Sequence, residues 1–308
     1  MDALVAVGPE PCADWVVEAV VRGGATVVPA AEANALVWTA PSGAADLQAL
    51  LASSPGITWV QLPWAGVEEY AAAGVFVDDR SGRRWTCGKG VYAEPVAEHA
   101  LALALAGLRL LPDRLRASSW GTQAGVSLYD GRATILGGGG ITESLVALLR
   151  PMRTEVTVVR RSGGSMDGVA RVVPPDRLHG TLPEADVVFL ALALTPETEG
   201  IFGAPELALM EPHAWLVNVA RGRHVDTDAL VEALRSGAIG GAGLDVTEPE
   251  PLPEGHPLWD LPNVIVTPHT ANTQEMAKPL LATRIAENVR RFGAGEALIG
   301  SVDRQLGY

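Results

Sequence analysis

Short apolar runs alternate with segments of helical periodicity along almost the whole chain. This alternation is typical of a parallel sheet whose strands are joined by crossover helices. In the first part of the chain the apolar runs predict four strands, over Leu4–Val7, Ala35–Thr39, Thr58–Leu62 and Val75–Asp78. Helical segments lie between them, over Asp14–Arg22 and Ala44–Ser53, and a longer helix follows over Pro95–Leu111.

The second part of the chain repeats the alternation with stronger strand signals. It predicts six strands, over Ala133–Leu136, Glu155–Val159, Asp186–Leu192, Ala214–Val219, Gly243–Val246 and Val264–Thr267. Six is the number expected of a complete dinucleotide-binding sheet. A last helical stretch, Gln274–Phe292, comes too late to add to that sheet, so we expect it to pack on the first domain. The predicted fold class is α/β, with two Rossmann-like domains built on doubly wound parallel sheets and an active-site cleft between the domains.

The composition fits such a protein and narrows its partners. The chain has 308 residues, of which 48% are apolar and 19% charged, as in ordinary globular domains. A net charge of −13 repels phosphate backbones, so we expect no nucleic-acid partner. The N-terminal run has no basic region and breaks at Gly8, and no apolar segment is long enough to span a bilayer, so we expect a cytoplasmic protein. Two cysteines are too few for a disulfide framework, and no metal-ligand spacing is present.

A glycine-rich loop follows the first predicted strand of the second domain. Its glycines run from Gly137 to Gly140, and a predicted helix begins there. Glycines at such a turn let backbone amides approach a pyrophosphate at the helix N-terminus, which predicts a dinucleotide site. Thr142 stands at the third position of the glycine fingerprint, where we expect its β-branched side chain to crowd the helix–strand contact. A glycine-rich turn without a ligand is the alternative.

Arg160 and Arg161 end the next predicted strand, and no acidic residue follows before Asp167. An acid at this position would bind the ribose hydroxyls of NADH and repel a 2′-phosphate, whereas paired guanidiniums bind a phosphate through charge-assisted hydrogen bonds. The two arginines therefore favour NADP(H), while NAD(H) stays possible. Because the chain has two lysines against many arginines, a solvated strand end is the alternative interpretation.

Three residues of the types needed to reduce a 2-keto acid follow three predicted strands of the second domain. Arg221 could hold a carboxylate and carbonyl, His269 could deliver a proton, and Glu250 could keep that histidine charged. The carboxyl ends of parallel strands meet at one edge of the sheet, where ligands bind in such folds. Each residue alone has a structural interpretation as a strand cap or loop residue. Their occurrence at one predicted edge favours catalysis.

Several segments of the second domain match one family pattern: Ala185–Leu190, Leu194–Thr198, Asn218–Gly222, Val225–Leu230, Leu244–Leu252 and Asn263–His269. With Val96–Ala100 and the glycine loop they cover most of residues 96–272. The chain resembles the D-isomer-specific 2-hydroxyacid dehydrogenase family, which includes glyoxylate/hydroxypyruvate reductases, phosphoglycerate dehydrogenases and corepressors of the same fold. The resemblance implies an oxidoreductase that transfers a hydride between a nicotinamide cofactor and a small 2-keto or D-2-hydroxy acid. Glyoxylate and hydroxypyruvate are the expected substrates.

The resemblance also assigns roles to residues. Arg221, Glu250 and His269 would be the catalytic set. Asp245 would hold the nicotinamide carboxamide, and the backbone at Val219 would lie beside the same ring. The implied cofactor-binding residues are Gly137, Gly139, Gly140, Ile141, Arg160, Arg161, Thr195, Val219 and Asp245. Backbone amides of Ala65, Gly66 and Val67 would receive the substrate carboxylate, together with Arg221. Residues 1–95 plus 273–308 would then form the substrate-binding domain, and residues 96–272 the dinucleotide-binding domain.

Other functions and partners stay open at this stage. The chain ends at Tyr308, so a phosphoglycerate dehydrogenase-like enzyme without a regulatory domain is one alternative, and a non-catalytic NAD(P)-sensing corepressor-like protein is another. By resemblance, the segment from Leu110 to Tyr129 would form the contact of a homodimer, with Trp120 as its anchor. We expect His99 to have a structural role at the start of its helix, and His224 to be a loop residue.

Overall fold

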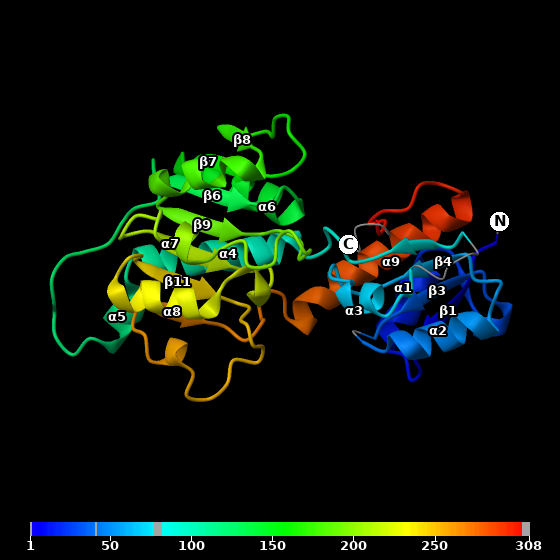
Figure 1. Ribbon diagram of the computed structural model, residues 1–308. Coiled ribbons are helices and arrows are strands. Elements are labelled where there is room, and N and C mark those ends of the chain that lie inside the picture. The colour runs from blue at the N-terminus through cyan, green and yellow to red at the C-terminus, as the bar shows by residue number, and fades with distance from the viewer. Residues whose placement is uncertain (1, 41, 77–81, 304–308) are drawn as a thin grey trace. The chain divides into compact units, whose positions relative to one another are not determined.

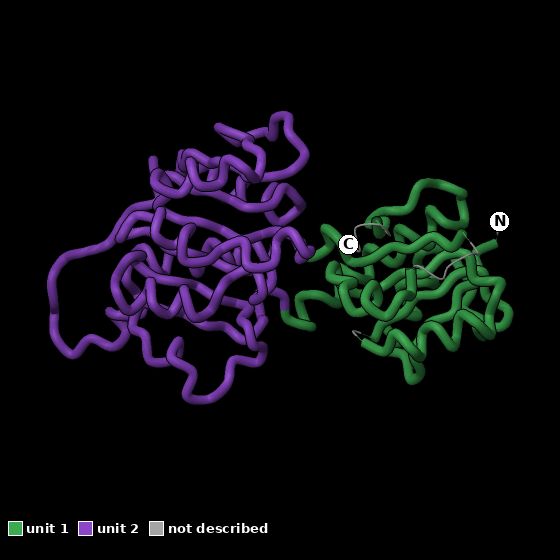
Figure 2. Tube along the Cα trace, in the orientation of Figure 1, with its two compact units in different colours: residues 1–92, 273–308 green, residues 93–272 purple. Residues whose placement is uncertain are grey.

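The computed structural model describes residues 2–40, 42–76 and 82–303, and it contains two parallel sheets (Figure 1). The chain divides into two compact units, which Figure 2 shows in different colours. Unit 1 comprises residues 1–92 and 273–308, and unit 2 comprises residues 93–272. The predicted α/β class with two parallel sheets is confirmed.

Unit 1 has a five-stranded sheet in the order β2-β1-β3-β4-β5. Its strands are β1 (Leu4–Gly8), β2 (Thr26–Val27), β3 (Ala35–Trp38), β4 (Trp59–Gln61) and β5 (Arg84–Thr86). Its helices are α1 (Asp14–Arg22), α2 (Ala44–Ser53), α3 (Glu68–Ala72) and α9 (Gln274–Ala294), with a 3₁₀ turn at Ala30–Glu32. Helix α9 packs along α1, and Gly23 permits this contact because a Cβ there would lie 2.6 Å from Val289 Cβ.

A buried polar network ties α9 to the sheet of unit 1. The Oε1 atom of Gln61 accepts hydrogen bonds from Thr86 Oγ1 and from Asn288 Nδ2, both at 2.8 Å. Asn288, which is fully buried, also bonds to the backbone O and N of Ile299 at 2.9 and 2.8 Å. Every member is a neutral amide or hydroxyl, so the network satisfies buried polar groups without burying a charge.

The expected strand over Val75–Asp78 is wrong. Val75 and Phe76 lie in a turn after α3 and are buried in the core of unit 1, and Asp78 lies outside the described residues. The fifth strand is instead β5, whose residues Arg84, Trp85 and Thr86 pair in register with β4. An apolar run indicates buried residues, and here the buried residues Val75 and Phe76 belong to a turn. The strand β5 itself has one apolar residue, Trp85.

Unit 2 has a seven-stranded sheet in the order β12-β11-β10-β9-β6-β7-β8. Its strands are β6 (Arg132–Leu136), β7 (Glu155–Val159), β8 (Arg171–Val173), β9 (Val187–Leu190), β10 (Trp215–Asn218), β11 (Gly241–Leu244) and β12 (Val264–Val266). Its helices are α4 (Ala93–Leu108), α5 (Leu111–Arg116), α6 (Gly140–Leu149), α7 (Ala204–Leu207) and α8 (Thr227–Ser236). Five 3₁₀ segments complete it, at Arg150–Met152, Pro175–Gly180, Leu182–Glu184, Gly222–His224 and Pro257–Trp259.

The direction of the chain reverses at β6, and this reversal positions the site. From β6 the chain proceeds outward through β7 to β8, then returns to pair β9 on the other side of β6. Right-handed crossovers in opposite directions put their helices on opposite faces of a sheet, so α6 lies with α4 on one face and α7 lies with α8 on the other. Ligands bind outside the carboxyl ends of the strands at such a switch point.

Two predictions for unit 2 need correction. The sheet has seven strands and not six, because the short edge strand β8 was missed. The strand expected over Gly243–Val246 is β11, two residues earlier, so Asp245 and Val246 lie in the segment that follows it. Glycines at Gly241 and Gly243 weaken the apolar signal at the start of this strand.

Helix α4 lies directly on the sheet of unit 2. A Cβ at Gly243 of β11 would come 2.9 Å from Leu103 Cβ, and a Cβ at Gly107 would overlap the indole of Trp215 in β10. Glycine on one partner at each contact allows the helix and sheet to approach closely. Among the described residues, no helix is long and apolar enough to cross a membrane.

Candidate active site

Arg221, Glu250 and His269 follow three adjacent strands of unit 2. Arg221 comes after β10, Glu250 after β11 and His269 after β12, and these parallel strands are neighbours in the sheet. Their carboxyl ends therefore lie along one edge. His269 Nδ1 and Glu250 Oε1 are 2.7 Å apart, and both side chains are partly exposed to solvent. Because the carboxylate only accepts, Nδ1 carries the hydrogen of this bond, which leaves Nε2 to exchange a proton with a ligand.

The loop that carries Arg221 is fixed by a buried asparagine. Asn218, the last residue of β10, donates from Nδ2 to Arg221 O at 2.9 Å and accepts from Ala220 N at 3.0 Å. The Arg221 side chain turns back so that Nη1 donates to Ala220 O at 2.8 Å. The sequence analysis assigned no role to Asn218. A polar residue at the end of an otherwise apolar strand was the available signal.

Gly222 brings the Arg221 loop against the loop of Glu250. A Cβ at Gly222 would overlap the backbone carbonyl of Thr247 and would lie 2.6 Å from Glu248 N. Only glycine allows the two backbones to approach this closely. The contact holds the segment after β10 and the segment after β11 in a fixed relation.

Asp245 organises the turn that contains His269. The carboxylate, 2% exposed, accepts hydrogen bonds from Thr267 Oγ1 at 2.6 Å, Thr270 N at 2.8 Å and Ala271 N at 3.0 Å. Its backbone O also accepts from His269 N at 2.9 Å. Burial alone would raise the pKa of Asp245, but hydrogen bonds from His99, Thr267 and the two amides outweigh it and lower the pKa to about 2.

His269 has a backbone conformation that side chains rarely adopt, with φ of 51°. Such a conformation persists where the surroundings determine it, and here the bonds from residues 267 to 271 to Asp245 do so. The contact of Asp245 with the nicotinamide carboxamide stays a prediction. The structure adds a second role, holding the turn of His269.

The glycine loop after β6 has the geometry of a phosphate cradle. Gly137 has φ of 111°, and a Cβ there would overlap Ala191 O. Gly139 caps the N-terminus of α6, and a Cβ on it would meet no atom within 4 Å, so space is open beside it. The N–H groups of the first helical turn, at Gly140 and Ile141, have no acceptor within the helix and suit an anion. These residues fit a dinucleotide pyrophosphate.

Thr142 is accommodated beside the glycine loop with its hydroxyl paired. It is fully buried, and its Oγ1 donates to Gly137 O at 3.0 Å. The hydroxyl of Thr142 thus bonds to the glycine loop. A glycine at this position has no side chain that could make this bond. The effect of the β-branched Thr142 side chain on the helix–strand contact stays a prediction.

The two arginines after β7 have different environments. Arg160 folds back over the glycine loop, since a Cβ at Gly138 would lie 2.6 Å from its Cδ. Its Nη2 donates to Gly163 O at 2.9 Å and to Ser165 O at 3.3 Å. Arg161 is exposed, and its charge contributes, after the hydroxyl of Thr195, to lowering the pKa of Glu197. Arg161 therefore lies near the turn that follows β9.

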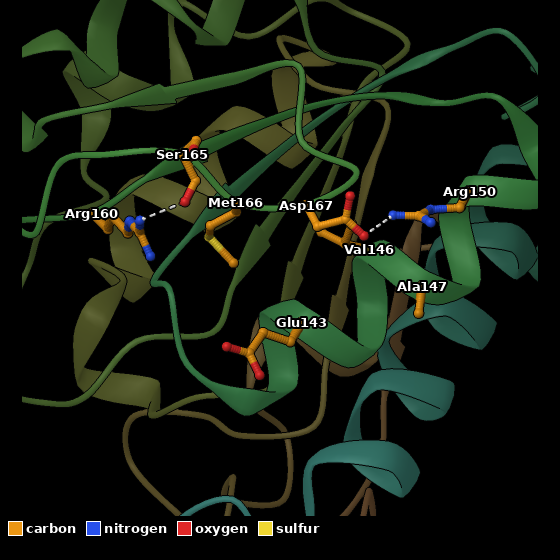
Figure 3. A pocket seen from close by; sticks show the side chains of 8 residues that line it. All are labelled: Glu143, Val146, Ala147, Arg150, Arg160, Ser165, Met166 and Asp167. Carbon is orange, nitrogen blue, oxygen red and sulfur yellow. Dashed lines mark hydrogen bonds and ion pairs between the residues drawn. The ribbon is translucent and has the colours of Figure 1, made fainter.

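A pocket of about 510 Å³ adjoins Arg160 (Figure 3). It lies between α6 and the segment of Ser165 to Asp167, and Arg150 pairs with Asp167 at its border. Arg160 reaches it from the opposite side (Figure 3). Its lining contains acidic side chains, Glu143 and Asp167, and basic ones, Arg150 and Arg160.

Thr195 and His224 lie in the segments after β9 and β10. Thr195 N donates to Thr198 Oγ1 at 2.8 Å, which closes the turn. His224 is fully buried, with Nδ1 2.9 Å from Thr198 O and Nε2 3.3 Å from Leu192 O. It is the last residue of the 3₁₀ segment Gly222–His224 and not a loop residue, and it links the segment after Arg221 to the turn of Thr195. Val219, also buried, is the residue that follows β10.

The predicted carboxylate-binding residues Ala65, Gly66 and Val67 belong to unit 1, in the loop between β4 and α3. Ala65 is exposed and Val67 buried, and Ala65 O lies 3.8 Å from Cys87 Sγ. Tyr92 supports this loop by donating to Pro63 O at 2.7 Å. Across the described part of the chain, no group of three or more His, Cys, Asp or Glu side chains could hold a metal ion.

Known proteins similar to this chain share both its sequence and its fold. A family model described as D-isomer specific 2-hydroxyacid dehydrogenase, NAD binding domain, matches residues 99–271. An uncharacterized protein of Corynebacterium melassecola is 40% identical over 258 residues, 82% of this chain and 84% of its own. A glyoxylate reductase of Pyrococcus furiosus is 34% identical over 242 residues, 75% of this chain and 69% of its own.

A solved structure extends the likeness to the whole chain. It is a D-isomer specific 2-hydroxyacid dehydrogenase from Xanthobacter autotrophicus in complex with NADPH and MES. The TM-score is 0.85 at 30% identity, over 100% of this chain and 99% of the other. The chain therefore belongs to the D-isomer specific 2-hydroxyacid dehydrogenase family, whose members are NAD(P)-dependent, and residues 99–271 match its NAD-binding domain.

Proposed function

We propose that this protein reduces a small 2-keto acid, of the size of glyoxylate or hydroxypyruvate, with NADPH as the preferred hydride donor. The pair of His269 Nδ1 and Glu250 Oε1 at 2.7 Å, on the same sheet edge as Arg221, is the observation that carries the proposal. The glyoxylate reductase of P. furiosus supports the choice of substrate class.

Each catalytic residue has a separate task in this reduction. Arg221 binds the carboxylate and polarises the carbonyl of the keto acid, because a guanidinium matches such a pair of oxygens. His269 gives the proton on Nε2 to the carbonyl oxygen as that oxygen gains negative charge. Glu250 accepts the Nδ1 hydrogen, orients the ring and stabilises the charged imidazole before transfer. A bound reduced nicotinamide would supply the hydride, so that one hydride and one proton convert the ketone to an alcohol.

The substrate and the cofactor would contact different groups of residues. Backbone amides of Ala65, Gly66 and Val67 in unit 1 would receive the substrate carboxylate, and Asp245 and the backbone at Val219 would face the nicotinamide. The cofactor pyrophosphate would lie on Gly139, Gly140 and Ile141, where the space beside Gly139 is open.

For the 2′-phosphate, we assign the contact to Arg161 and a supporting role to Arg160. The side chain of Arg160 covers Gly138 and is held at the glycine loop by Gly163 O and Ser165 O. Arg161 is exposed and lies near the turn of Thr195. The X. autotrophicus protein, 30% identical, was solved with NADPH. The sequence alone predicts that both arginines bind the 2′-phosphate, so this assignment differs from that prediction.

Absorbance of the reduced nicotinamide tests the proposal directly. NADPH and NADH would be supplied separately with glyoxylate, hydroxypyruvate, pyruvate and bulkier 2-keto acids. We expect turnover with a small keto acid and a higher kcat/KM for NADPH. Tight NADPH binding without turnover of any keto acid would contradict the reductase and favour a nucleotide-sensing protein.

Substitution of Arg161 tests the cofactor preference. Arg161→Ser should lower kcat/KM for NADPH about 10- to 100-fold, as expected for losing a charge-assisted hydrogen bond, and leave that for NADH within about twofold. Arg177→Ser, at another exposed arginine of unit 2, is the matched control. An unchanged cofactor ratio in Arg161→Ser would refute the assignment.

We also propose a homodimer through the arm between α4 and β6, which runs outward from the sheet (Figure 1). Leu115 on α5 is 87% exposed and Trp120 beyond it is 95% exposed. Large apolar side chains on a projecting arm are suited to bury against a second copy. Light scattering should show a dimer for the native chain and a monomer for Trp120→Ser with Leu115→Ser. A native monomer would refute it.

A further inference from the structure

His99 lies outside the proposed catalytic set but faces it. It is on α4, four residues before Leu103 and eight before Gly107, so the three share one helical face. Leu103 packs on Gly243 and Gly107 on Trp215, which shows that this face is turned to the sheet of unit 2. Moving from Gly107 toward His99 follows the strands from their beginning toward their carboxyl ends, where the turn of His269 lies.

The hydrogen bonds of His99 are directional. His99 Nε2 is 3.0 Å from Thr267 Oγ1 and 3.4 Å from Asp245 Oδ1. Asp245 is an ionised carboxylate that can only accept, and Thr267 Oγ1 lies 2.6 Å from its Oδ1. The single hydroxyl hydrogen of Thr267 is therefore given to Asp245. Since the hydroxyl has no second hydrogen, His99 must donate from Nε2 to Thr267.

This chain of donors ends at the turn of the proposed proton donor. Asp245 holds Thr267, Thr270 and Ala271 through its carboxylate and His269 through its backbone O. Thr267 contributes the one side-chain hydroxyl among these donors, and a second partner on its oxygen restricts its rotation beyond what the bond to Asp245 does. His99 supplies that partner.

We propose that His99 is a positioning residue of this enzyme, which acts through the Thr267 hydroxyl and the Asp245 carboxylate to aim the His269 imidazole. The proposal rests on the proposed function in that His269 transfers the proton. It replaces the expectation that His99 has only a structural role at the start of its helix.

The test compares substitutions that keep or remove the donor. His99→Leu should lower kcat about tenfold, which is within the roughly hundredfold loss that a 1 Å misplacement of a reacting group can cause, with the Kd for NADPH unchanged. The Tm should fall only slightly, because Asp245 keeps its hydrogen bonds from residues 267 to 271. His99→Gln, which can place an N–H near the position of Nε2, should recover most of the loss. His179→Leu is the matched control, a histidine of unit 2 whose Nε2 bonds instead to Glu206 at 2.7 Å.

A double-mutant cycle decides whether His99 acts through Thr267. Thr267→Val keeps the shape of the residue and removes its hydroxyl. If His99 acts through that hydroxyl, His99→Leu in a Thr267→Val background should cost less than about twofold further in kcat. Wild-type kcat in His99→Leu, losses that multiply in the double variant, or failure of His99→Gln to recover would each overturn the proposal.

Amide hydrogen exchange provides a readout that needs no turnover. The amides of Thr270 and Ala271 bond to Asp245 and should exchange about tenfold faster in His99→Leu than in native protein or in His179→Leu. If the native protein reduces no keto acid, the proposed function fails. Amide hydrogen exchange then remains as the test of whether His99 positions the turn of His269. Unchanged exchange in His99→Leu would refute it.

Discussion

In unit 1 the buried polar side chains of Gln61, Thr86 and Asn288 bond to one another and hold helix α9 on the sheet, whereas in unit 2 the buried carboxylate of Asp245 bonds to a turn at the sheet edge. Both networks satisfy polar groups that burial would otherwise penalise. The first is neutral and lies inside the core. The second contains a charge and ends at the partly exposed pair of His269 and Glu250.

The difference shows how similar hydrogen bonding has separate uses in the two units. A neutral network within a core determines which elements pack together, and its loss should lower the free energy of unfolding. A charged network at the carboxyl ends of strands determines where a side chain points, and its loss should lower the rate of the proposed reaction. Substitutions in the two networks should therefore separate activity from stability.

The largest expected effect is in unit 2, on activity alone. His269→Asn removes the proposed proton donor while keeping a polar side chain, and kcat should fall about 10²- to 10⁴-fold. Because the imidazole is more than half exposed, the Tm should change little. The measurement is initial rate with a saturating keto acid, beside NADPH binding by fluorescence. Near-native kcat would remove His269 from the mechanism.

The second effect is in unit 1, on stability. Asn288→Leu leaves the backbone N and O of Ile299 without their side-chain partner, which should lower the free energy of unfolding by about 1–3 kcal/mol. Urea denaturation measures this loss, and Gln48→Leu, at an exposed amide of the same unit, is the control. Because the network has no titratable group, the loss should be the same from pH 5 to pH 8. If Asn288→Leu has the same free energy of unfolding as the native protein, the network contributes nothing to stability.

The last effect is the dependence of the stability of unit 2 on acid, which appears only as the pH falls below about 4. The pKa of Asp245 is about 2 in the folded protein and about 3.9 in an unfolded chain, so its ionised form stabilises the fold by about 2–3 kcal/mol above pH 4. That contribution should disappear as the pH falls from about 4 to 2. Asp245→Asn should lose stability at pH 7 and show a shallower acid transition. Parallel acid transitions in the two proteins would contradict the lowered pKa.

Local pattern was sufficient for much of unit 2. The apolar runs of β6, β7, β9 and β10 are buried strands that pair along their length, so each carries a clear signal. The short strand β8 lies at the edge of the sheet with one exposed and two partly buried residues, so it has no clear apolar signal. In unit 1 the apolar run at Val75 fills the core from a turn, which periodicity could not distinguish from a strand.

The sequence by itself determined the α/β class, the glycine-rich turn after β6, and the residues Arg221, Glu250 and His269 as candidates, because each depends on residue type and on position relative to an apolar strand. Tertiary structure decided what those residues contact. The pairing of His269 with Glu250, the burial of Asp245 beneath the turn, and the placement of Arg160 over Gly138 and of Arg161 near Glu197 all join separate segments of the chain. Such contacts depend on how strands are ordered in the sheet, which local pattern does not contain.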